Sequence, residues 1–515
     1  MRPFVLTIVV SSILAVPSWA QEDHHDHGGK PLQLGRVSFP TSCAPSVRQS
    51  FERSVALLHS FWYEQAGRGF KEVGAADSTC AMARWGEAMS LLHPLWTPPS
   101  AADNEAGLQS ARRAVALSRE GSRERAYADA IAAYYTDYAT VDAKDRLLGY
   151  ERAMASLVER FPSDEEGRIF YALALIANGQ NDSRDTTLTR QRQAGEILEP
   201  LFRRHPQHPG LAHYLIHAYD SPALARRGIQ AAGRYALIAP SVPHAQHMPS
   251  HIYVRVGRWD DVIAANRRSA ESAAAFERQK GTTVMWDQRA HAFDYLVYAY
   301  LQEKRAADAL AVVNEVSRVT EVFPAGALTS DYALAAIPAR YALERDDWAA
   351  AETLTVRPAP VWRAAEALTR FARAIGASRS GHLAAARAET DSLSTIESAL
   401  AKAGGPQTYW SGQVRIQRMA AASWVAFAAG DTTAALSGAL AAADLEDHTE
   451  KHPVTPGAVL PARELYGDLL MLSGRQDDAR HAYQACLVRQ PGRARSLAGL
   501  GQATKRQTSR SEGAR

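Results

Sequence analysis

Apolar and polar residues alternate along most of the chain with the spacing of paired amphipathic helices. The segments YVRVGRWDDVIAANRRSA, YAYLQEKRAADALAVVNEV and LLMLSGRQDDARHAYQACLVRQP each hold two stretches in which apolar residues recur three and four positions apart, joined by a short polar turn. This pattern predicts helical hairpins. Because one such hairpin cannot bury its apolar face alone, successive hairpins must stack on one another.

The hairpins repeat at an interval of about 34 residues. If Pro240 ends one unit, Tyr219 of that unit pairs with Tyr253 of the next, which lies at this interval. The period, with large residues in the first helix and small residues in the second, is typical of tetratricopeptide repeats (TPRs). We therefore expect an all-α fold over residues 39–502, a TPR-like right-handed superhelical solenoid of roughly ten to twelve hairpins.

Both ends of the chain lack this pattern. Residues 1–20 combine an arginine, an apolar run and the small residues Ser18 and Ala20, which predict a secretory signal peptide and export, most simply to a bacterial periplasm. Residues 21–38 are polar and include the tract HHDHGG, so we expect a flexible His-rich N-terminal segment. The polar residues 503–515 are expected to form a disordered tail.

Composition narrows the range of functions. The chain has 515 residues, of which 46% are apolar and 22% charged, and its net charge of +3 gives no reason to expect nucleic acid as a partner. No stretch after the leader is long and apolar enough for stable membrane insertion. The three cysteines form no CxxC pair, and the sequence leaves open whether Cys43 and Cys80 form a disulfide. Motifs for dinucleotides, nucleoside triphosphates and hydrolase elbows are also missing.

Histidines gather in one part of the repeat array. His213 and His217 recur one repeat later as His247 and His251, at positions that face the concave groove of a TPR solenoid. Residues four apart on a helix share a face, so each pair presents two imidazoles together, and the four could form a rectangle. The candidate metal ligands are His213, His217, Asp220, His244, His247 and His251.

This set of side chains points to a divalent transition metal. Clustered imidazoles with one carboxylate and no thiolate suit Zn, Fe or Cu. The HExxH pattern of zinc proteases is missing, so the catalytic residue of an enzyme at this site is unknown. Pro249 is expected to interrupt its helix, which could leave His244 and His247 in a preceding turn. Further candidates at groove positions are Trp85, His93, His291, Asp294 and Glu464.

Several segments of the mature chain resemble a family of exported bacterial TPR proteins. They are FPTSC, LLHSFWYEQAGRGF, CAMARWGEAMSLLHPLW, HPGLAHYLIHAYD, HAQHMPSHIYVRVGRWDDV, HAFDYLVYAYLQ and EKHPVTPGAVLPARELYGDLL. The resemblance covers most of the mature chain and implies a TPR-like fold and export. It implies no particular activity.

Three functions follow from these observations. The leading one is an exported TPR-like protein whose concave groove binds a transition metal. The second is a periplasmic scaffold that binds a peptide or protein in the same groove without metal, as repeat solenoids commonly do. The third is a metalloenzyme of unknown reaction, because a histidine site can keep coordination positions open.

Overall fold

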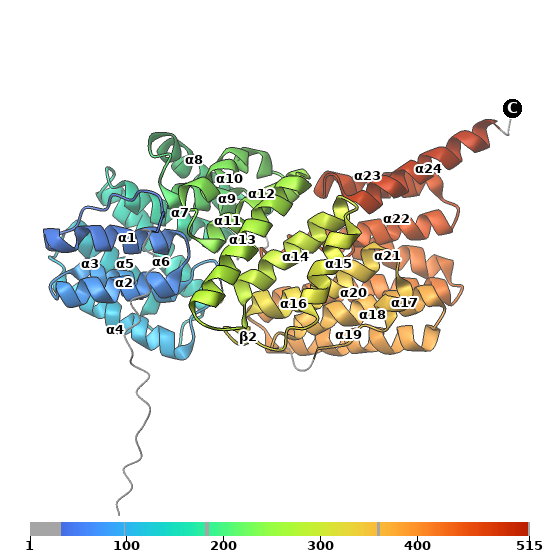
Figure 1. Cartoon of the computed structure of the whole chain (residues 1–515), viewed down its shortest axis with the longest axis horizontal. Helices are drawn as coiled ribbons and strands as arrows, with labels where there is room; N and C mark the ends of the chain where they lie inside the picture. The colour runs from blue at the N-terminus through green and yellow to red at the C-terminus, as the bar shows by residue number, and fades with distance from the viewer. Residues whose placement is uncertain (1–31, 97, 181–184, 358–360, 513–515) are drawn as a thin grey trace, which may run out of the picture. The chain divides into compact units, whose positions relative to one another are not determined.

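Helices account for almost all the regular structure in the computed structural model, which describes residues 32–96, 98–180, 185–357 and 361–512 (Figure 1). The signal peptide expected over residues 1–20 and the HHDHGG tract lie outside the described residues. All elements described below belong to the unit Leu34–Arg515.

The elements follow one another in a single order along the chain. The first half consists of the 3-10 helix η1 (Pro45–Val47), α1 (Arg48–His59), α2 (Tyr63–Ala76), α3 (Ala81–Leu92), α4 (Ala101–Leu117), α5 (Arg123–Tyr135), α6 (Ala143–Arg160), α7 (Glu165–Gln180), α8 (Thr189–Arg204), α9 (Pro209–Tyr219), α10 (Ala225–Ile238), α11 (Pro243–His247), α12 (Pro249–Val256) and α13 (Trp259–Gln279). The second half consists of β1 (Met285–Trp286), α14 (Asp287–Gln302), α15 (Ala306–Val316), β2 (Val322–Phe323), α16 (Leu328–Glu344), α17 (Trp348–Glu352), α18 (Arg363–Ser380), α19 (Leu383–Ala403), α20 (Gln407–Ala428), α21 (Thr432–Asp447), α22 (Ala462–Leu472), α23 (Gln476–Arg489) and α24 (Ala494–Glu512). The two short strands pair in parallel, with Met285 opposite Val322.

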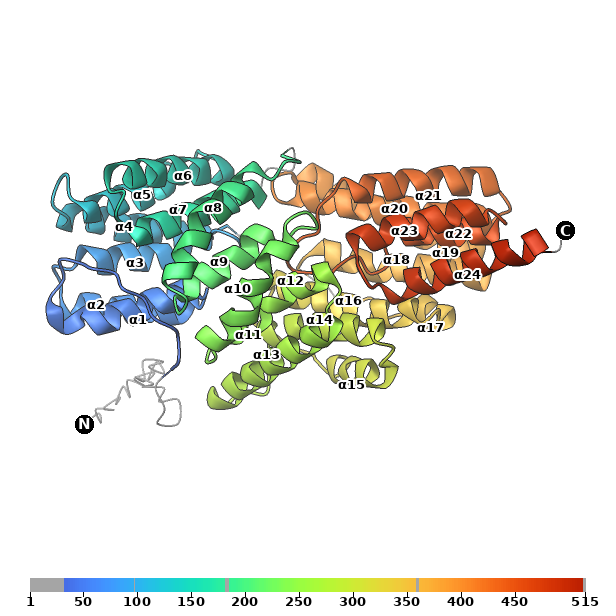
Figure 2. The same cartoon turned by 90° about the horizontal axis from the view of Figure 1, so that it is seen from above.

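Consecutive helices pack against one another as stacked hairpins (Figures 1 and 2). Small residues let them approach closely: at Gly228 in α10, a Cβ atom would lie only 2.6 Å from Ile252 in α12. The predicted all-α, TPR-like solenoid is confirmed. In the described residues, no helix is long and apolar enough to cross a membrane.

The turn between α12 and α13 touches the turn between α23 and α24. Gly257 has a φ of +70°, and a Cβ there would lie 2.5 Å from the carbonyl oxygen of Pro491, so both conformation and space require glycine. The Trp259 indole N–H donates to the carbonyl of Gly492 over 3.1 Å. The C-terminal hairpins therefore pack back onto the middle of the solenoid and do not simply extend the stack.

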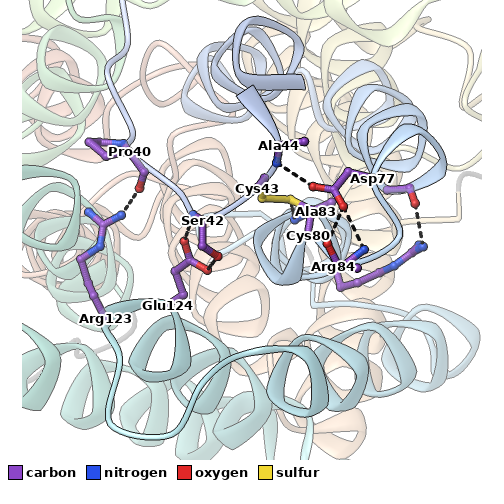
Figure 3. Close-up of a disulfide and its surroundings, with 12 residues drawn as sticks. Pro40, Ser42, Cys43, Ala44, Asp77, Cys80, Ala83, Arg84, Arg123 and Glu124 are labelled. Carbon is purple, nitrogen blue, oxygen red and sulfur yellow. Dashed lines mark hydrogen bonds between the residues drawn. A yellow bond between two sulfur atoms is a disulfide. The ribbon is translucent and has the colours of Figure 1, made fainter. Parts of the chain in front are cut away.

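A disulfide between Cys43 and Cys80 fastens the segment before α1 to the start of α3 (Figure 3). The backbone N–H of Ala44 donates to Asp77 over 2.7 Å, and the hydroxyl of Ser42 donates to Glu124 in α5 over 2.6 Å. The question that the sequence left open is thereby answered: these two cysteines are paired. Cys486 is free and buried in α23.

The structure departs from the sequence-based boundaries at both ends of the solenoid. Leu34 is buried and the N–H of Arg36 donates to the carbonyl of Gln207, so the ordered segment begins before residue 39. Helix α24 runs on to Glu512, past the boundary expected at residue 502. The polar residues there contain no proline, so a helix begun by packed residues can continue through them.

Candidate metal centre

Six histidines from four helices converge in two groups of three. The first group, which we call triad 1, contains His213 and His217 of α9 and His244 of α11. Triad 2 contains His247 of α11, His251 of α12 and His291 of α14. Within each triad the ring nitrogens that could bind a metal all lie within 4.8 Å of one another.

The break between α11 and α12 places histidines on two short helices. Pro249 begins α12, as expected from its missing N–H, and His244 and His247 occupy the five-residue helix α11 before it. These two histidines are three residues apart in the sequence, and their side chains point to different groups. His244 belongs to triad 1 and His247 to triad 2. The four histidines of the predicted rectangle are thus divided between two triads.

In triad 1 the Nε2 atom of His213 is the centre of the group. Its Nδ1–H donates to the backbone carbonyl of His59 over 2.6 Å, which leaves the lone pair on Nε2. The Nε2 atoms of His217 and His244 lie 3.1 and 3.2 Å from it. Three ring nitrogens therefore point to one place.

In triad 2, hydrogen bonds to neighbouring residues set the tautomers of His247 and His251. The amide nitrogen of Asn266 donates to Val262, so its oxygen faces His247 and accepts that ring's Nδ1–H over 2.6 Å. The Nδ1–H of His251 donates to Asp220 over 2.9 Å. The Nε2 atoms of His247 and His251 then both carry lone pairs, and they face each other across 3.0 Å. This contact is repulsive unless a cation or a proton lies between the two atoms.

Asp220 binds the Nδ1 side of His251 and is not one of the three residues of triad 2. Its carboxylate accepts from His251, from Arg255 over 2.8 Å and from Lys451 over 3.4 Å. Burial alone would raise the pKa of Asp220, but Lys451 and Arg255 hold it well below its usual value. The predicted ligand Asp220 is thus placed where a carboxylate orients a metal-binding imidazole.

Burial favours the neutral form of the triad histidines. Burial is the main cause that lowers the pKa of five of them well below 6.5, and it also lowers the pKa of His251, against the opposing effect of Asp220. Neutral imidazole is the form that binds metal. Burial and hydrogen bonding therefore prepare these rings as ligands. The five histidines whose pKa lies well below 6.5 are His213, His217, His244, His247 and His291.

Phe61, in the turn between α1 and α2, covers triad 1. Its ring centre lies 4.3 Å from that of His213, and it stacks on His217 and His244 at 5.6 and 5.8 Å. Phe61 has a φ of +56°, which is rare for a bulky side chain. Its buried ring limits the access of water to the triad.

Triad 1 approaches the surface at His244, which is half-buried. Trp96 packs against this ring at 5.7 Å and keeps 42% of its own surface exposed. His93 and Tyr63 complete this aromatic edge, with His93 half-buried and 4.3 Å from Tyr63. His93, one of the further candidates from the sequence, thus lies at the rim of the site.

A third histidine group, which we call the Glu166 cluster, is satisfied by its own hydrogen bonds. Glu166 accepts from His59 Nε2 over 3.0 Å and from His208 Nε2 over 2.9 Å. The other ring nitrogens accept from the Tyr214 hydroxyl and from the N–H of Leu211. Although burial raises the pKa of Glu166, the two histidines hold it at about 2. Each ring nitrogen of this cluster has a partner from the chain itself.

Three residues proposed from the sequence lie away from the triads. Trp85 is fully buried against Phe39 and Phe170, where it packs in an aromatic core, so it does not line a ligand pocket. Asp294 pairs with Arg340, and burial raises its pKa to about 6 against the effect of that arginine. Glu464 binds Arg493 and Arg495 beside α24.

Three residues of the Cys43 region resemble metal ligands only by their chemistry. Cys43, Asp77 and Cys80 lie close together, but both sulfurs are joined in the disulfide and cannot act as thiolate ligands. Asp77 accepts from Ala44 and Thr79 instead.

Two supporting residues of triad 2, Asn266 and Lys451, were not found from the sequence. Asn266 lies at a core position of its helix, where a buried amide is unusual, and that position is a signal that could have identified it. Lys451 belongs to the segment between α21 and α22, which has no helical period. In the same segment, the carbonyls of Pro453 and Thr455 accept hydrogen bonds from the hydroxyl of Tyr295. The ring of Tyr295 packs against triad 2.

A cavity adjoins the two cations that pair with Asp220. Arg255 and Lys451 line it together with Tyr409, Trp410 and other residues of α20 and the segment before α22. Because Arg255 and Lys451 both bind Asp220, the wall of the cavity is connected to His251 through a single carboxylate.

Among known proteins, only solved structures are similar to this chain. No model of a protein family matches the chain, and no curated protein is similar to it. The chain is similar to the TPR domain of P58(IPK), with 12% identity and a TM-score of 0.20 over 89% of this chain and 98% of that one. It is also similar to a chain of the APC/C heterotetramer Cut9–Hcn1 (12% identity, TM-score 0.33, covering 89% and 76%) and to human IFIT1 in its dimer with m7Gppp-AAAA (12%, 0.33, covering 79% and 89%). These scores carry no functional information, and the TPR-like fold rests on the helical hairpins of this chain itself.

Proposed function

We propose that this chain is a metalloprotein that binds transition-metal ions at triads 1 and 2. The observation that carries the proposal is the 3.0 Å contact between the Nε2 atoms of His247 and His251. The Nδ1–H of His247 donates to Asn266, and the Nδ1–H of His251 donates to Asp220. A metal ion between the lone pairs turns this repulsion into coordination.

A shared proton is the alternative occupant of that contact, and burial of the two rings opposes it. A proton would make one imidazole cationic, whereas Asp220 is already paired with Arg255 and Lys451. Burial lowers the pKa of His251, although Asp220 acts in the opposite direction. A metal also explains triad 1, where three Nε2 atoms meet without an anion among them.

The ligand chemistry limits the choice of ion. In the described residues, both triads consist of imidazoles alone, which suit Zn, Cu, Fe and Ni and do not suit Mg, Ca or Mn. Three protein ligands leave at least one position open in a tetrahedral site, which is the arrangement of catalytic metals. The site therefore supports binding of a further small ligand at the metal.

Metal analysis of the purified mature chain tests the proposal. We expect bound Zn, Cu or Fe in the wild type and a loss of metal in the His213→Ala, His217→Ala double variant, with helical content unchanged by circular dichroism. A wild-type chain that holds no metal and takes up none at micromolar concentration would overturn it.

Metal-independent binding of a peptide is the second candidate, and the cavity beside Asp220 favours it. Aromatic residues such as Tyr409 and the cations Arg255 and Lys451 line this cavity together. A peptide library screened against the metal-free chain tests it. Binding that is lost in Tyr409→Ala supports this function, and equal binding by both chains would remove the cavity as its site.

We also propose that the chain acts after export, in a bacterial periplasm. The Cys43–Cys80 disulfide supports an oxidising compartment, because disulfides rarely persist in the cytosol. Mass spectrometry of the chain from a periplasmic extract should find an N-terminus at residue 21. An uncleaved chain in the cytosolic fraction would contradict export.

A further inference from the structure

We propose that the two triads form one dinuclear copper centre that binds dioxygen. This inference rests on the proposed function and goes further in three respects: the number of ions, their identity and the molecule that they bind. The geometry that supports it is the contact between the triads themselves.

The two triads share a continuous layer of imidazoles. The ring centres of His217 and His251 lie 6.1 Å apart, and those of His244 and His247 lie 6.3 Å apart. Each pair joins one ring of triad 1 to one ring of triad 2. With metal–nitrogen bonds of about 2.0–2.1 Å, ions held by such rings come close enough to share a small ligand, as ions about 3.5–4 Å apart do in dinuclear sites.

Charge selects the metal. Five of the six rings are buried and His244 is half-buried, and in the described residues no carboxylate or thiolate belongs to either triad. Two divalent ions would bring four positive charges into this site without an anionic ligand, which is costly in a low dielectric. Two Cu(I) ions bring only two. Imidazole is a suitable ligand for copper.

Dioxygen fits the open positions that the triads leave. Each Cu(I) ion gives one electron to dioxygen, which becomes a bridging peroxide dianion while both ions become Cu(II). No proton and no further reductant is required, and the release of dioxygen returns both electrons. The total charge of the centre stays at two positive charges, so binding dioxygen adds no net charge to the buried site.

The surroundings favour a small neutral ligand. Phe61 covers triad 1, and the aromatic edge of Tyr63 and Trp96 lies where His244 approaches the surface. Tyr295 packs its ring on His247 and His251, 4.6 and 5.4 Å away. Such apolar surfaces admit dioxygen more readily than a charged substrate.

Anaerobic loading with Cu(I) tests the inference. The metal-free chain is incubated with excess Cu(I) under argon, freed of unbound copper and exposed to dioxygen. We expect two copper ions per chain, uptake of one dioxygen per two copper ions, and Cu(II) that is silent in electron paramagnetic resonance because the bridged ions are coupled. Removal of dioxygen should reverse the uptake.

Single variants show whether both triads are needed. His213→Ala in triad 1 and His291→Ala in triad 2 should each retain one copper ion and lose dioxygen uptake, whereas the exposed control His481→Ala should behave as the wild type. Circular dichroism checks that each variant is folded, and the wild-type result stands even if one variant is not.

The outcomes separate this inference from the proposed function. One copper ion per chain, or two ions with uncoupled Cu(II) signals and no dioxygen uptake, would overturn the dinuclear centre and leave metal binding intact. A chain that binds two zinc ions tightly and copper weakly would overturn both the copper assignment and the dioxygen binding, and would leave the dinuclear site intact. A chain that binds no metal at all would overturn both.

Discussion

The triads and the Glu166 cluster are both groups of buried histidines on neighbouring elements, and they differ in where the ring lone pairs point. In the Glu166 cluster, each ring nitrogen of His59 and His208 has a hydrogen-bond partner from the chain, and one carboxylate receives both N–H groups. In the triads, the Nδ1–H groups of His213, His247 and His251 point outward to acceptors and the Nε2 atoms face one another. The first arrangement is complete as a structural unit, and the second leaves ring nitrogens facing one another that a cation could join.

The comparison teaches that proximity of histidines alone does not identify a metal site. All three groups bring their ligand atoms within 4.8 Å. What separates them is the hydrogen bond made by the other ring nitrogen, which decides whether a lone pair remains for a metal. The same criterion removes the Cys43 region, where the sulfurs are bonded to each other.

The largest expected effect comes from removing one ligand from each kind of cluster. His247→Ala should lose the metal of triad 2, because only two imidazoles remain there. His208→Ala should keep the full metal content, because its ring binds Glu166 instead. Metal analysis of both variants checks this. Equal metal loss in the two would erase the distinction between the clusters.

The second effect is on stability and belongs to the Glu166 cluster. His208→Ala leaves the buried Glu166 with one partner, and breaking a buried pair costs about 3–5 kcal/mol of the free energy of unfolding. Urea unfolding of the metal-free chains measures this cost. A change below about 1 kcal/mol would mean that Glu166 does not need His208.

The pH dependence of that cluster follows from the lowered pKa of Glu166. Because this pKa is about 2 in the folded chain and 4.5 without neighbours, its stabilising contribution is complete above pH 4.5 and is lost as the pH falls toward 2. The shift corresponds to about 3 kcal/mol. In Glu166→Gln, urea unfolding at decreasing pH should show a smaller loss of stability over this interval, and an identical pH profile would contradict the role given to Glu166.

A smaller effect is expected from the residue that orients His247. Asn266→Ala removes the acceptor for Nδ1–H and frees the ring to change its tautomer. Loss of such a partner typically weakens metal affinity 10–100-fold. Competition with a chelator measures the affinity of triad 2, with the exposed His481→Ala as the control. Unchanged affinity would mean that Asn266 does not set the tautomer.

The smallest effect is expected at the exposed edge. Trp96→Ala removes a partly exposed ring that contacts His244 and no metal-binding nitrogen. Stability should change by less than about 0.5 kcal/mol, as for most surface positions, and the metal content should stay the same. A chelator should remove metal from triad 1 faster, and an unchanged rate would show that Trp96 does not limit access.

The repeat period explains why part of the site could be predicted. His213 and His247, like His217 and His251, occupy equivalent positions of consecutive repeats, and stacked repeats bring equivalent positions side by side. The all-α fold follows from the same periodicity. What the period could not provide is the division into triads, because the short helix α11 turns His244 and His247 in different directions.

Residues outside the regular repeat were harder to place. His291 follows an insertion with the short strand β1, which interrupts the period and left its distance from the other histidines open. Lys451 and the carbonyls that hold Tyr295 come from a segment without helical spacing, more than 150 residues away in sequence. Such long-range contacts depend on how the whole solenoid packs, and no local pattern encodes them.

The most direct test of the central claim is a crystal structure of the metal-loaded chain with anomalous diffraction recorded at the absorption edge of the bound metal. The account predicts anomalous density within both triads, next to His213 and His247, and none between His59, Glu166 and His208. Density in the Glu166 cluster, or empty triads in a chain loaded to saturation, would contradict it.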